Sequence, residues 1–315
     1  MMFINESESL SIVKKHLAMS FDVDEKNLSQ WLNWHGRSEG KLIRSHLALS
    51  TGEALGVSTH TAIIWAVVCE LIHSASLLHD DVCDSDEIRR GKVSVWKNFG
   101  IPAAICTGDY LIAESFRKIT EIEQGWHQNI LLGLLSGTVK EIVFGQSVDV
   151  NSNFLGLGWE EYKKLATAKT SPLICLPIIG MFKCAELEEP YYINLRKLTD
   201  DLGLAYQIVN DLENILINES NEIPTDIKFE RVNALIVCLK EISSEKEINF
   251  LKKNKSELKQ YLLSSNIAGD LILKIDNILQ SIKNSIHLMP VVIRPIIFSL
   301  SEEIKKRSHQ FAHAN

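Results

Sequence analysis

The chain has 315 residues, 45% of them hydrophobic and 23% charged, which is typical of a globular protein with one large domain or two small ones. Its formal net charge of −7 argues against a general nucleic-acid-binding protein. The six cysteines show no CxxC spacing, so neither a zinc site nor a disulfide framework is indicated, and we expect a reduced, cytoplasmic setting.

Helical periodicity dominates the chain, and there is no run of short alternating strands. We expect a first helix near Ser9, followed by helices over Gly40–Leu55, Ser58–Asp84, Ile101–Glu121, His127–Val148, Trp159–Thr170, Pro172–Cys184, Glu189–Ile217, Val232–Ser243, Glu245–Ser264, Ile267–Lys283 and Arg294–His309. Repeated helices without strands between them predict an all-α bundle, which we expect to form a single domain over residues 1–315.

Two stretches bear on membrane targeting. The N-terminal residues are acidic where a signal peptide needs a basic start and an apolar core, so no such peptide is expected. The apolar run Thr61–Leu78 is long enough to resemble a membrane span, but Glu70 and His73 interrupt it. We therefore expect a buried helix and no membrane span.

The first polar motif in chain order is GKLIR, at the start of an expected helix. Lys41 and Arg44 are three residues apart and share one side of that helix, whose N-terminus also favours anions. An anion site is one interpretation, and a solvated basic helix face is the simpler one.

A dense acidic cluster follows the apolar run. Asp80 and Asp84 are four residues apart, so they share one helix face, and His73 lies two turns earlier on the same stripe. Paired carboxylates suit Mg²⁺, which completes its shell with water and substrate phosphates, and Arg89 and Arg90 suit phosphate contact. The pattern predicts a diphosphate site with Mg²⁺; the alternative is a solvated helix end with internal ion pairs.

Two weaker polar groups lie further along the chain. Lys169 and Thr170 precede Pro172, where we expect the helix to break or kink, and they could hold phosphate or lie in a surface loop. Gln146 and Asp149 share one helix face, either toward a site or as a buried polar pair.

A polar stripe crosses the apolar helix GLAYQIVNDLENI. Gln207, Asn210 or Asp211, and Asn214 fall on one face, and polar groups on an apolar helix need partners. They either line a cavity or form satisfied core contacts.

The segment HSASLLHDDVCDSDEIRRGK resembles the first aspartate-rich motif, DDxxD with an Arg pair, of the polyprenyl (trans-isoprenyl) diphosphate synthase family. GKLIR, GDYLIAESF, GQSVDV, KT and GLAYQIVNDLEN occur in that family's order, so the resemblance covers about Gly40 to Arg231. It implies an isoprenoid-synthase-type helical bundle around a central cavity, usually a homodimer, that condenses isopentenyl diphosphate with an allylic diphosphate.

The resemblance also implies residue roles. Isopentenyl diphosphate would bind Lys41, Arg44, His73 and Arg90. The allylic diphosphate would be held, partly through Mg²⁺, by Asp80, Asp84, Arg89, Lys169, Thr170 and Gln207. Asp80, Asp84 and Lys169 would be the catalytic groups, and Asn210 and Asp211 would help to bind a third Mg²⁺.

The second aspartate-rich motif departs from the family pattern. Its DDxxD is replaced by Asn210, Asp211, Leu212, Glu213 and Asn214. Amide oxygens bring no charge, so the third Mg²⁺ should bind less tightly. Asn221 and Glu222 also stand where the family has a Lys, and Arg231 could substitute for a later one.

This asymmetry leaves three interpretations. The protein is a prenyl diphosphate synthase, or a prenyltransferase or terpene-cyclase-like enzyme that ionises an allylic diphosphate but uses another acceptor, or a non-catalytic regulatory subunit. The complete set for isopentenyl diphosphate favours the first, and the intact first motif argues against the third.

Product length depends on the helix below Asp80. One turn away lie Ser76 and Ala75, where short-chain enzymes of the family place an aromatic floor. These small residues predict a product of about twenty carbons or more, at about one isoprene unit per helical turn. Ile72, Cys69 and Trp65 lie lower and could form a floor, and Phe116 could also intrude.

Overall fold

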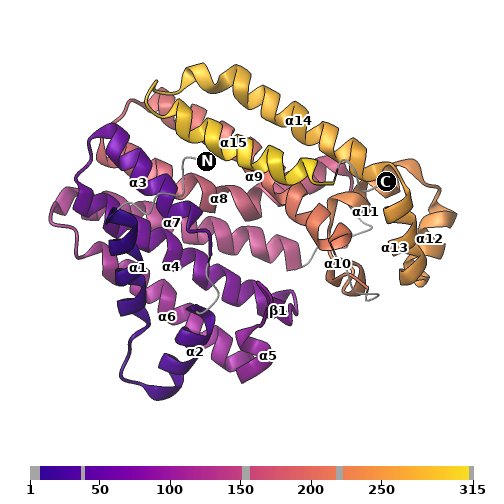
Figure 1. Ribbon diagram of the computed structural model, residues 1–315, viewed down its shortest axis with the longest axis horizontal. Helices are drawn as coiled ribbons and strands as arrows, with labels where there is room; N and C mark the ends of the chain where they lie inside the picture. Colours follow the sequence, from indigo (N-terminus) through magenta and orange to yellow (C-terminus); the bar gives the residue numbers. More distant parts are fainter. Residues whose placement is uncertain (1–7, 37–39, 151–156, 218–222, 312–315) are drawn as a thin grey trace. The chain divides into compact units, whose positions relative to one another are not determined.

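The computed structural model describes residues 8–36, 40–150, 157–217 and 223–311 (Figure 1). Regular structure in these residues is almost entirely helical, which confirms the predicted all-α class. The chain divides into two compact units, one made of Met1–Val143 and Leu173–Ile193, the other of Phe144–Pro172 and Asn194–Asn315. A single domain over residues 1–315 stays a prediction.

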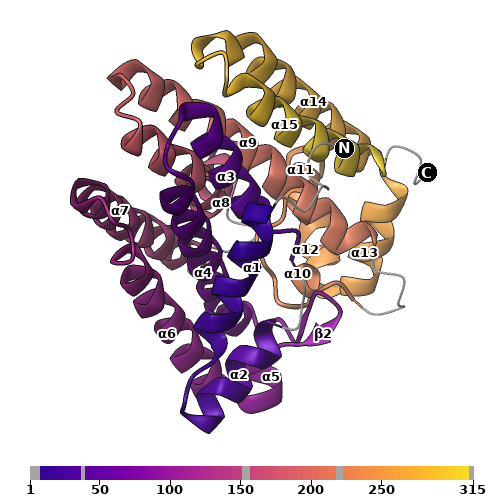
Figure 2. The same cartoon turned by 60° about the vertical axis from the view of Figure 1, so that its left-hand side comes forward.

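The first unit is built around one long central helix. Its helices are α1 (Glu8–Phe21), α2 (Lys26–Gly36), α3 (Ile43–Leu55), α4 (Thr59–Cys83), α5 (Val95–Phe99) and α6 (Ile101–Ile119), together with parts of α7 and α8. Figure 2 shows α1, α4 and α6 side by side, and α4 packs most extensively against α6.

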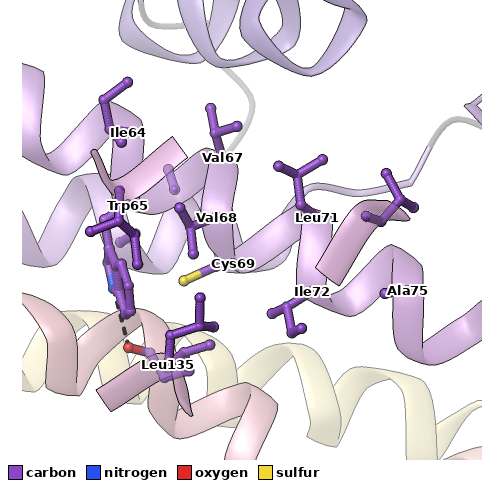
Figure 3. Close-up of a cluster of buried hydrophobic side chains, with 14 of the residues drawn as sticks. Ile64, Trp65, Val67, Val68, Cys69, Leu71, Ile72, Ala75 and Leu135 are labelled. Atoms are coloured by element: carbon purple, nitrogen blue, oxygen red, sulfur yellow. Dashed lines mark hydrogen bonds between the residues drawn. The ribbon is translucent and has the colours of Figure 1, made fainter. Parts of the chain in front are cut away.

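Helix α4 is buried on all sides along its first half. Its residues from Thr61 to Ile72 are buried without a gap, which explains why the sequence there is apolar without helical periodicity (Figure 3). The indole Nε1 of Trp65 donates to the Leu176 carbonyl at 3.2 Å. Helices α4 and α8 (Trp159–Cys184) are each long and apolar enough to cross a membrane, but both are mostly buried in the protein.

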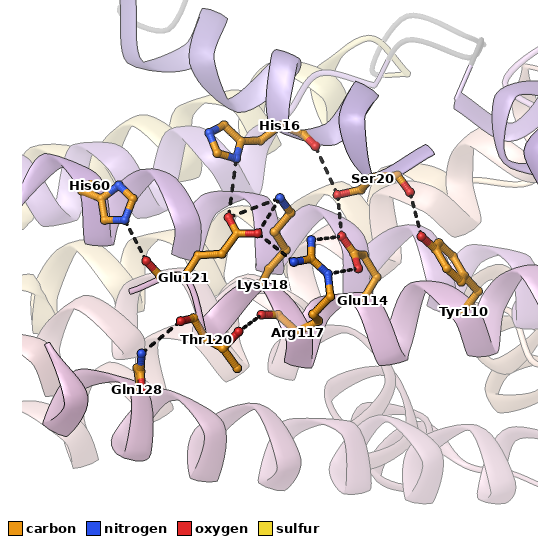
Figure 4. Close-up of polar contacts among 10 residues, drawn as sticks. All are labelled: His16, Ser20, His60, Tyr110, Glu114, Arg117, Lys118, Thr120, Glu121 and Gln128. Atoms are coloured by element: carbon orange, nitrogen blue, oxygen red, sulfur yellow. Dashed lines mark hydrogen bonds and ion pairs between the residues drawn. The ribbon is translucent and has the colours of Figure 1, made fainter. Parts of the chain in front are cut away.

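A polar network joins α1 to the C-terminal half of α6 (Figure 4). The buried Glu114 accepts from Ser20 Oγ at 3.1 Å and from two nitrogens of Arg117 at 2.6 and 2.7 Å. Tyr110 donates to the Ser20 carbonyl at 3.3 Å. These contacts satisfy a carboxylate that would otherwise be costly to bury, and they fix α1 against α6.

A two-residue hairpin follows α4 and was not predicted from the sequence. Strands β1 (Ile88–Arg89) and β2 (Lys92–Val93) pair antiparallel. Arg90 and Gly91 between them have φ of 52° and 74°, which is the left-handed pair of a type I′ turn. The tight turn presents Arg89 and Arg90 as neighbours on a defined backbone.

Three long helices contribute residues to both units: α7 (Gly125–Val150), α8 and α9 (Glu189–Leu216). The predicted helix break at Pro172 is wrong, because α8 is continuous. Proline removes only the hydrogen bond to the Ala168 carbonyl. Gly145 of α7 lies against that carbonyl so closely that an added Cβ would be 2.7 Å from its oxygen, so helix packing accommodates the site.

The second unit continues as shorter helices. They are α10 (Thr225–Lys228), α11 (Ala234–Ile242), α12 (Glu245–Lys253), α13 (Lys255–Ser264), α14 (Ile267–Ser285), the 3₁₀ turn η1 (Ile286–Leu288) and α15 (Arg294–His309). The single helix expected over Glu245–Ser264 is two, because Asn254 leaves the helical region with φ −121° and ψ 74°. A capping box between Ser244 and Glu247 starts α12.

Candidate active site

The start of α3 carries the two basic residues predicted for an anion. The backbone and hydroxyl of Ser45 both donate to Glu70 of α4, at 2.9 and 3.3 Å, so this carboxylate caps the N-terminus of α3. Lys41 is exposed and Arg44 is half-buried beside this cap. Within the described residues the buried Arg44 Nε has no hydrogen-bond partner, which leaves it available to a ligand.

Arg90 lies against the same end of α3. An added Cβ at Gly40 would be 2.7 Å from Arg90 Nη1, so the guanidinium rests on the Gly40 backbone. The hairpin therefore delivers Arg90 to the GKLIR segment, and Arg90 is otherwise exposed.

The buried His35 and the half-buried His73 complete this basic cluster, which consists of His35, Arg44, His73 and Arg90. Burial, followed by the positive charges of Arg44 and Arg90, holds the pKa of His73 well below its usual range. Burial and the same kind of repulsion from Arg90 and Arg89 lower the pKa of His35 to about 4. Both imidazoles are therefore neutral near pH 7, and His73 Nδ1 is buried with no hydrogen-bond partner among the described residues.

His35 was missed in the sequence analysis. It lies on α2 at helical spacing after Leu28, Trp31 and Leu32, so this stripe could have predicted its burial, although no motif marked it as a ligand. Neutral imidazoles do not add to the repulsion between the two guanidinium groups, and guanidinium groups suit contact with a diphosphate.

The first acidic motif ends α4. Asp84 is the C-cap residue, its backbone N–H donates to the Asp80 carbonyl at 2.7 Å, and both side chains are half-buried on the last turn. They are the residues that could hold Mg²⁺ in this unit. No cluster of three His, Cys, Asp or Glu side chains preorganised for a metal lies in the described parts of the chain, so any such ion would need water and phosphate ligands as well.

Arg89 and Asp81 form an ion pair at the base of this motif. Arg89 Nε donates to Asp81 Oδ1 at 2.6 Å, Nη2 also contacts that oxygen, and Nη2 reaches Asp86 Oδ2 at 3.1 Å. The Asp81 side chain is 2% exposed, and burial raises its pKa to about 6 although Arg89 opposes the shift. The predicted phosphate ligand Arg89 is thus held by acids of its own motif.

In the second unit, residues from α7, α8 and α9 meet. Lys169 Nζ donates to Asp149 Oδ2 at 2.7 Å, and Thr170 Oγ1 donates to Gln207 Oε1 at 2.9 Å. The structure thereby brings together three residues predicted for the allylic diphosphate, Lys169, Thr170 and Gln207. Nearby on α7, Gln146 Nε2 is buried without a hydrogen-bond partner among the described residues.

Both carboxylate oxygens of Asp211, in the second motif, accept hydrogen bonds from protein groups. Its Oδ2 accepts from Tyr162 at 2.7 Å and from the Ala234 backbone at 2.8 Å, and its Oδ1 accepts from Gln207 Nε2 at 2.8 Å. Burial and the nearby Asp226 raise its pKa to about 7, against the effect of these donors. Both oxygens face protein donors, rather than the open metal position that the sequence suggested.

The other residues of the second motif are also paired. Asn210 Oδ1 accepts from Arg307 Nη2 at 3.0 Å, and Asn214 Nδ2 donates to Thr225 Oγ1 at 3.0 Å. Arg307, on α15, had no signal in the sequence, because the contact joins residues 97 positions apart.

Several predicted residues have simpler surroundings. Arg231 Nη1 lies 3.6 Å from Asp226 Oδ1, and the guanidinium lies over the ring of Phe229. Ala75 is buried, and Ser76 donates its hydroxyl to the His73 carbonyl at 2.8 Å. Asn221 and Glu222 lie outside the described residues.

Comparisons with known proteins identify the family. A profile of the polyprenyl synthetase family matches residues 25–263. The chain is 28% identical over 209 residues to a farnesyl diphosphate synthase of Micrococcus luteus, covering 64% of this chain and 72% of that protein. It is 29% identical over 252 residues to a short chain isoprenyl diphosphate synthase of Methanocaldococcus jannaschii, covering 77% and 75%.

Solved structures share the fold. A decaprenyl diphosphate synthase from Rhodobacter capsulatus has a TM-score of 0.83 at 20% identity, over 96% of this chain and 97% of that one. A geranylgeranyl pyrophosphate synthetase from Pyrococcus horikoshii has a TM-score of 0.83 at 23% identity, over 96% and 98%.

Proposed function

Because this chain belongs to the polyprenyl synthetase family and is a prenyltransferase, we propose that it condenses isopentenyl diphosphate with an allylic diphosphate to make a longer polyprenyl diphosphate. The observation that carries the proposal is the basic cluster, in which Arg44 and His73 keep buried, unpartnered nitrogen atoms among the described residues. Polar atoms left in this state are costly unless a ligand pairs with them.

The basic cluster is the binding site for isopentenyl diphosphate in this proposal. Arg44 and Arg90 provide guanidinium groups for the diphosphate, and the exposed Lys41 adds a further positive charge. A neutral His73 can donate or accept one hydrogen bond without adding to the repulsion between the arginines. A terpene cyclase has no need of this set.

The family resemblance, and not the placement of the two units, assigns the allylic diphosphate to Asp80, Asp84, Lys169, Thr170 and Gln207. A bound Mg²⁺ supplies positive charge for the departing diphosphate, and Asp80 and Asp84 are the residues that would hold it. Lys169, in the second unit, would add positive charge for the departing diphosphate. Arg89 takes an indirect part, since it positions the motif through Asp81.

The reaction then needs a dry, apolar surface more than a side-chain base. The allylic C–O bond breaks, the double bond of isopentenyl diphosphate forms the new C–C bond, and a proton passes to the released diphosphate. The apolar residues of α4, such as Ile72 and Ala75, shield the cation from water.

Helix α4 also supports a longer product. Ser76 does not protrude, because its hydroxyl is bonded to its own helix, and Ala75 is small. Trp65 lies fifteen residues before Asp80, about 22 Å along the helix axis, which corresponds to about four isoprene units at about one per turn. Its indole is fixed to the Leu176 carbonyl, so it is our candidate for the floor. This supports a product of about twenty carbons.

We also propose a homodimer in the cytoplasm. Ile101 and Ile105 of α6 and Trp126 and Val143 of α7 are large apolar side chains between 42% and 61% exposed. A second copy of the chain would cover them.

A second candidate function rests on the pairing of Asn210 and Asp211 with protein groups. This pairing favours either an enzyme that ionises an allylic diphosphate and transfers it to another acceptor, as a terpene-cyclase-like enzyme would, or a regulatory subunit.

Product analysis separates these functions. Purified protein with Mg²⁺ would receive isopentenyl diphosphate paired in turn with dimethylallyl, geranyl, farnesyl and geranylgeranyl diphosphates, and each allylic diphosphate alone. Elongated diphosphates that require isopentenyl diphosphate support the synthase. Hydrocarbon or alcohol from an allylic diphosphate alone favours the cyclase-like enzyme, and no product at all favours the regulatory subunit.

A further inference from the structure

The second acidic motif is closed by an arginine from the C-terminal helix. Arg307 Nε donates to Glu213 Oε1 at 2.9 Å, and its Nη2 donates to Glu213 Oε2 at 2.7 Å. The same Nη2 donates to Asn210 Oδ1 at 3.0 Å. A two-pronged guanidinium–carboxylate pair is the strongest and most specific geometry that these groups can form.

The guanidinium is also held from its other side. It lies over the ring of Tyr206, 4.7 Å from the centroid, and the Arg307 side chain is 14% exposed. Burial opposes its charge, but Glu213 and Tyr206 more than compensate and raise the pKa of Arg307. Arg307 is therefore a permanent cation held by Tyr206, Asn210 and Glu213, which lie one or two turns apart on α9.

The remaining acid of the motif, Asp211, also has both carboxylate oxygens bonded to protein donors. Asp211 gives both oxygens to Tyr162, Ala234 and Gln207. Every polar side chain from Asn210 to Asn214 therefore has a protein partner, and the oxygens that a third Mg²⁺ would need are already accepting hydrogen bonds.

We propose that the second motif is a guanidinium site and not a metal site. Arg307 occupies the oxygens there that the sequence predicts as ligands of a third Mg²⁺, and the pairing of Glu213 with Arg307 leaves the group neutral. That a third Mg²⁺ would have faced a diphosphate rests on the proposed function; the pairing of the motif with Arg307 does not.

This arrangement explains why residue 210 is asparagine rather than aspartate. An Asp at that position would add a second carboxylate to one guanidinium and leave the group with a net negative charge. An amide oxygen accepts from Arg307 Nη2 without adding charge. The departure from DDxxD is then the counterpart of Arg307, rather than a weakened metal ligand.

The test counts divalent cations. Mn²⁺ bound per chain would be measured at saturating inorganic diphosphate from the electron paramagnetic resonance signal of free Mn²⁺. Wild type, Asn210→Asp and Glu213→Gln should bind the same number, because none of these side chains ligates metal while Arg307 is present. The double variant Asn210→Asp, Arg307→Ala should bind one more, because it exposes two carboxylates.

The controls separate charge from folding. Lys306→Ala removes a positive charge from the adjacent, exposed position of α15 and should leave the Mn²⁺ count unchanged. Asn210→Asp should raise the melting temperature, because the hydrogen bond to Arg307 becomes an ion pair. If the double variant does not fold, Asn210→Asp and Glu213→Gln still decide the question.

Two results would overturn the proposal: an additional Mn²⁺ in Asn210→Asp alone, or a lost Mn²⁺ in Glu213→Gln. Asp80→Ala tests the proposed function separately. A Mn²⁺ count that Asp80→Ala does not change would contradict the metal role of the first motif and leave the inference about Arg307 intact.

Discussion

Arg89→Ala is the substitution whose effect the structure predicts most fully. The Asp81 carboxylate is 2% exposed and relies on Arg89 for its charge partner, while the Arg89 side chain is 28% exposed. Removing one partner of a fully buried ion pair costs about 3–5 kcal/mol, and the partial exposure of Arg89 favours the lower end, about 3 kcal/mol. We expect this loss in the free energy of unfolding.

The pH dependence identifies the cause. The pKa of Asp81 is already raised, to about 6 from an ordinary 3.8, so the folded state binds its proton more tightly than the unfolded state. Stability from this group therefore falls as pH rises from about 4 toward 6. Without Arg89 the pKa should rise further, so the destabilisation should be larger at pH 8 than at pH 5.

Urea unfolding at the two pH values measures both effects. Arg90→Ala is the matched control, because it is the next residue of the same turn and its side chain is exposed; it should cost less than about 0.5 kcal/mol. In a double-mutant cycle with Asp81→Asn, the coupling energy should reach about 1–3 kcal/mol. An Arg89→Ala protein as stable as Arg90→Ala, with no pH dependence, would refute a structural role for Arg89.

Other substitutions test further parts of the site. Asp80→Ala should abolish turnover while leaving the melting temperature nearly unchanged, as measured by product formation and circular dichroism; substantial residual turnover would contradict its metal role. Ser76→Phe should shorten the product, and an unchanged product distribution would rule out α4 as the channel wall. Tyr162→Phe removes the hydroxyl donor to the buried Asp211 and should cost about 1.5–3 kcal/mol in urea unfolding, and a neutral result would refute that contact. Gly145→Ala should cost about 1–3 kcal/mol, because the new Cβ would meet the Ala168 carbonyl; a more stable protein would contradict this close packing.

The sequence predicted most of the long helices, because each needs an apolar surface of regular spacing to be buried. It predicted α4 from an uninterrupted apolar run, and the structure explains that run by burial on all sides. The hairpin carrying Arg89 and Arg90 gave no signal, since strands of two residues are too short to show alternation. The helix break predicted at Pro172 was wrong, because local propensity does not include the packing of α7 against α8.

The site was less predictable than the fold. Spacing along one helix placed Asp80 and Asp84 together, and the family's motif order led to Lys41, Arg44 and His73. His35 and Arg307 reach their positions through contacts between distant segments, which periodicity does not encode. The sequence also could not show that Asn210 faces an arginine. From the sequence we expect a weak third Mg²⁺ site at the second motif, whereas the proposal from the structure is a site closed by Arg307.

The most direct measurement is the transfer of label from isopentenyl diphosphate into product. Purified protein with Mg²⁺, radiolabelled isopentenyl diphosphate and unlabelled farnesyl diphosphate should yield a labelled, longer polyprenyl diphosphate, and Arg44→Ala should raise the KM for isopentenyl diphosphate more than that for farnesyl diphosphate. Label that stays in isopentenyl diphosphate across all allylic partners would contradict the proposed condensation.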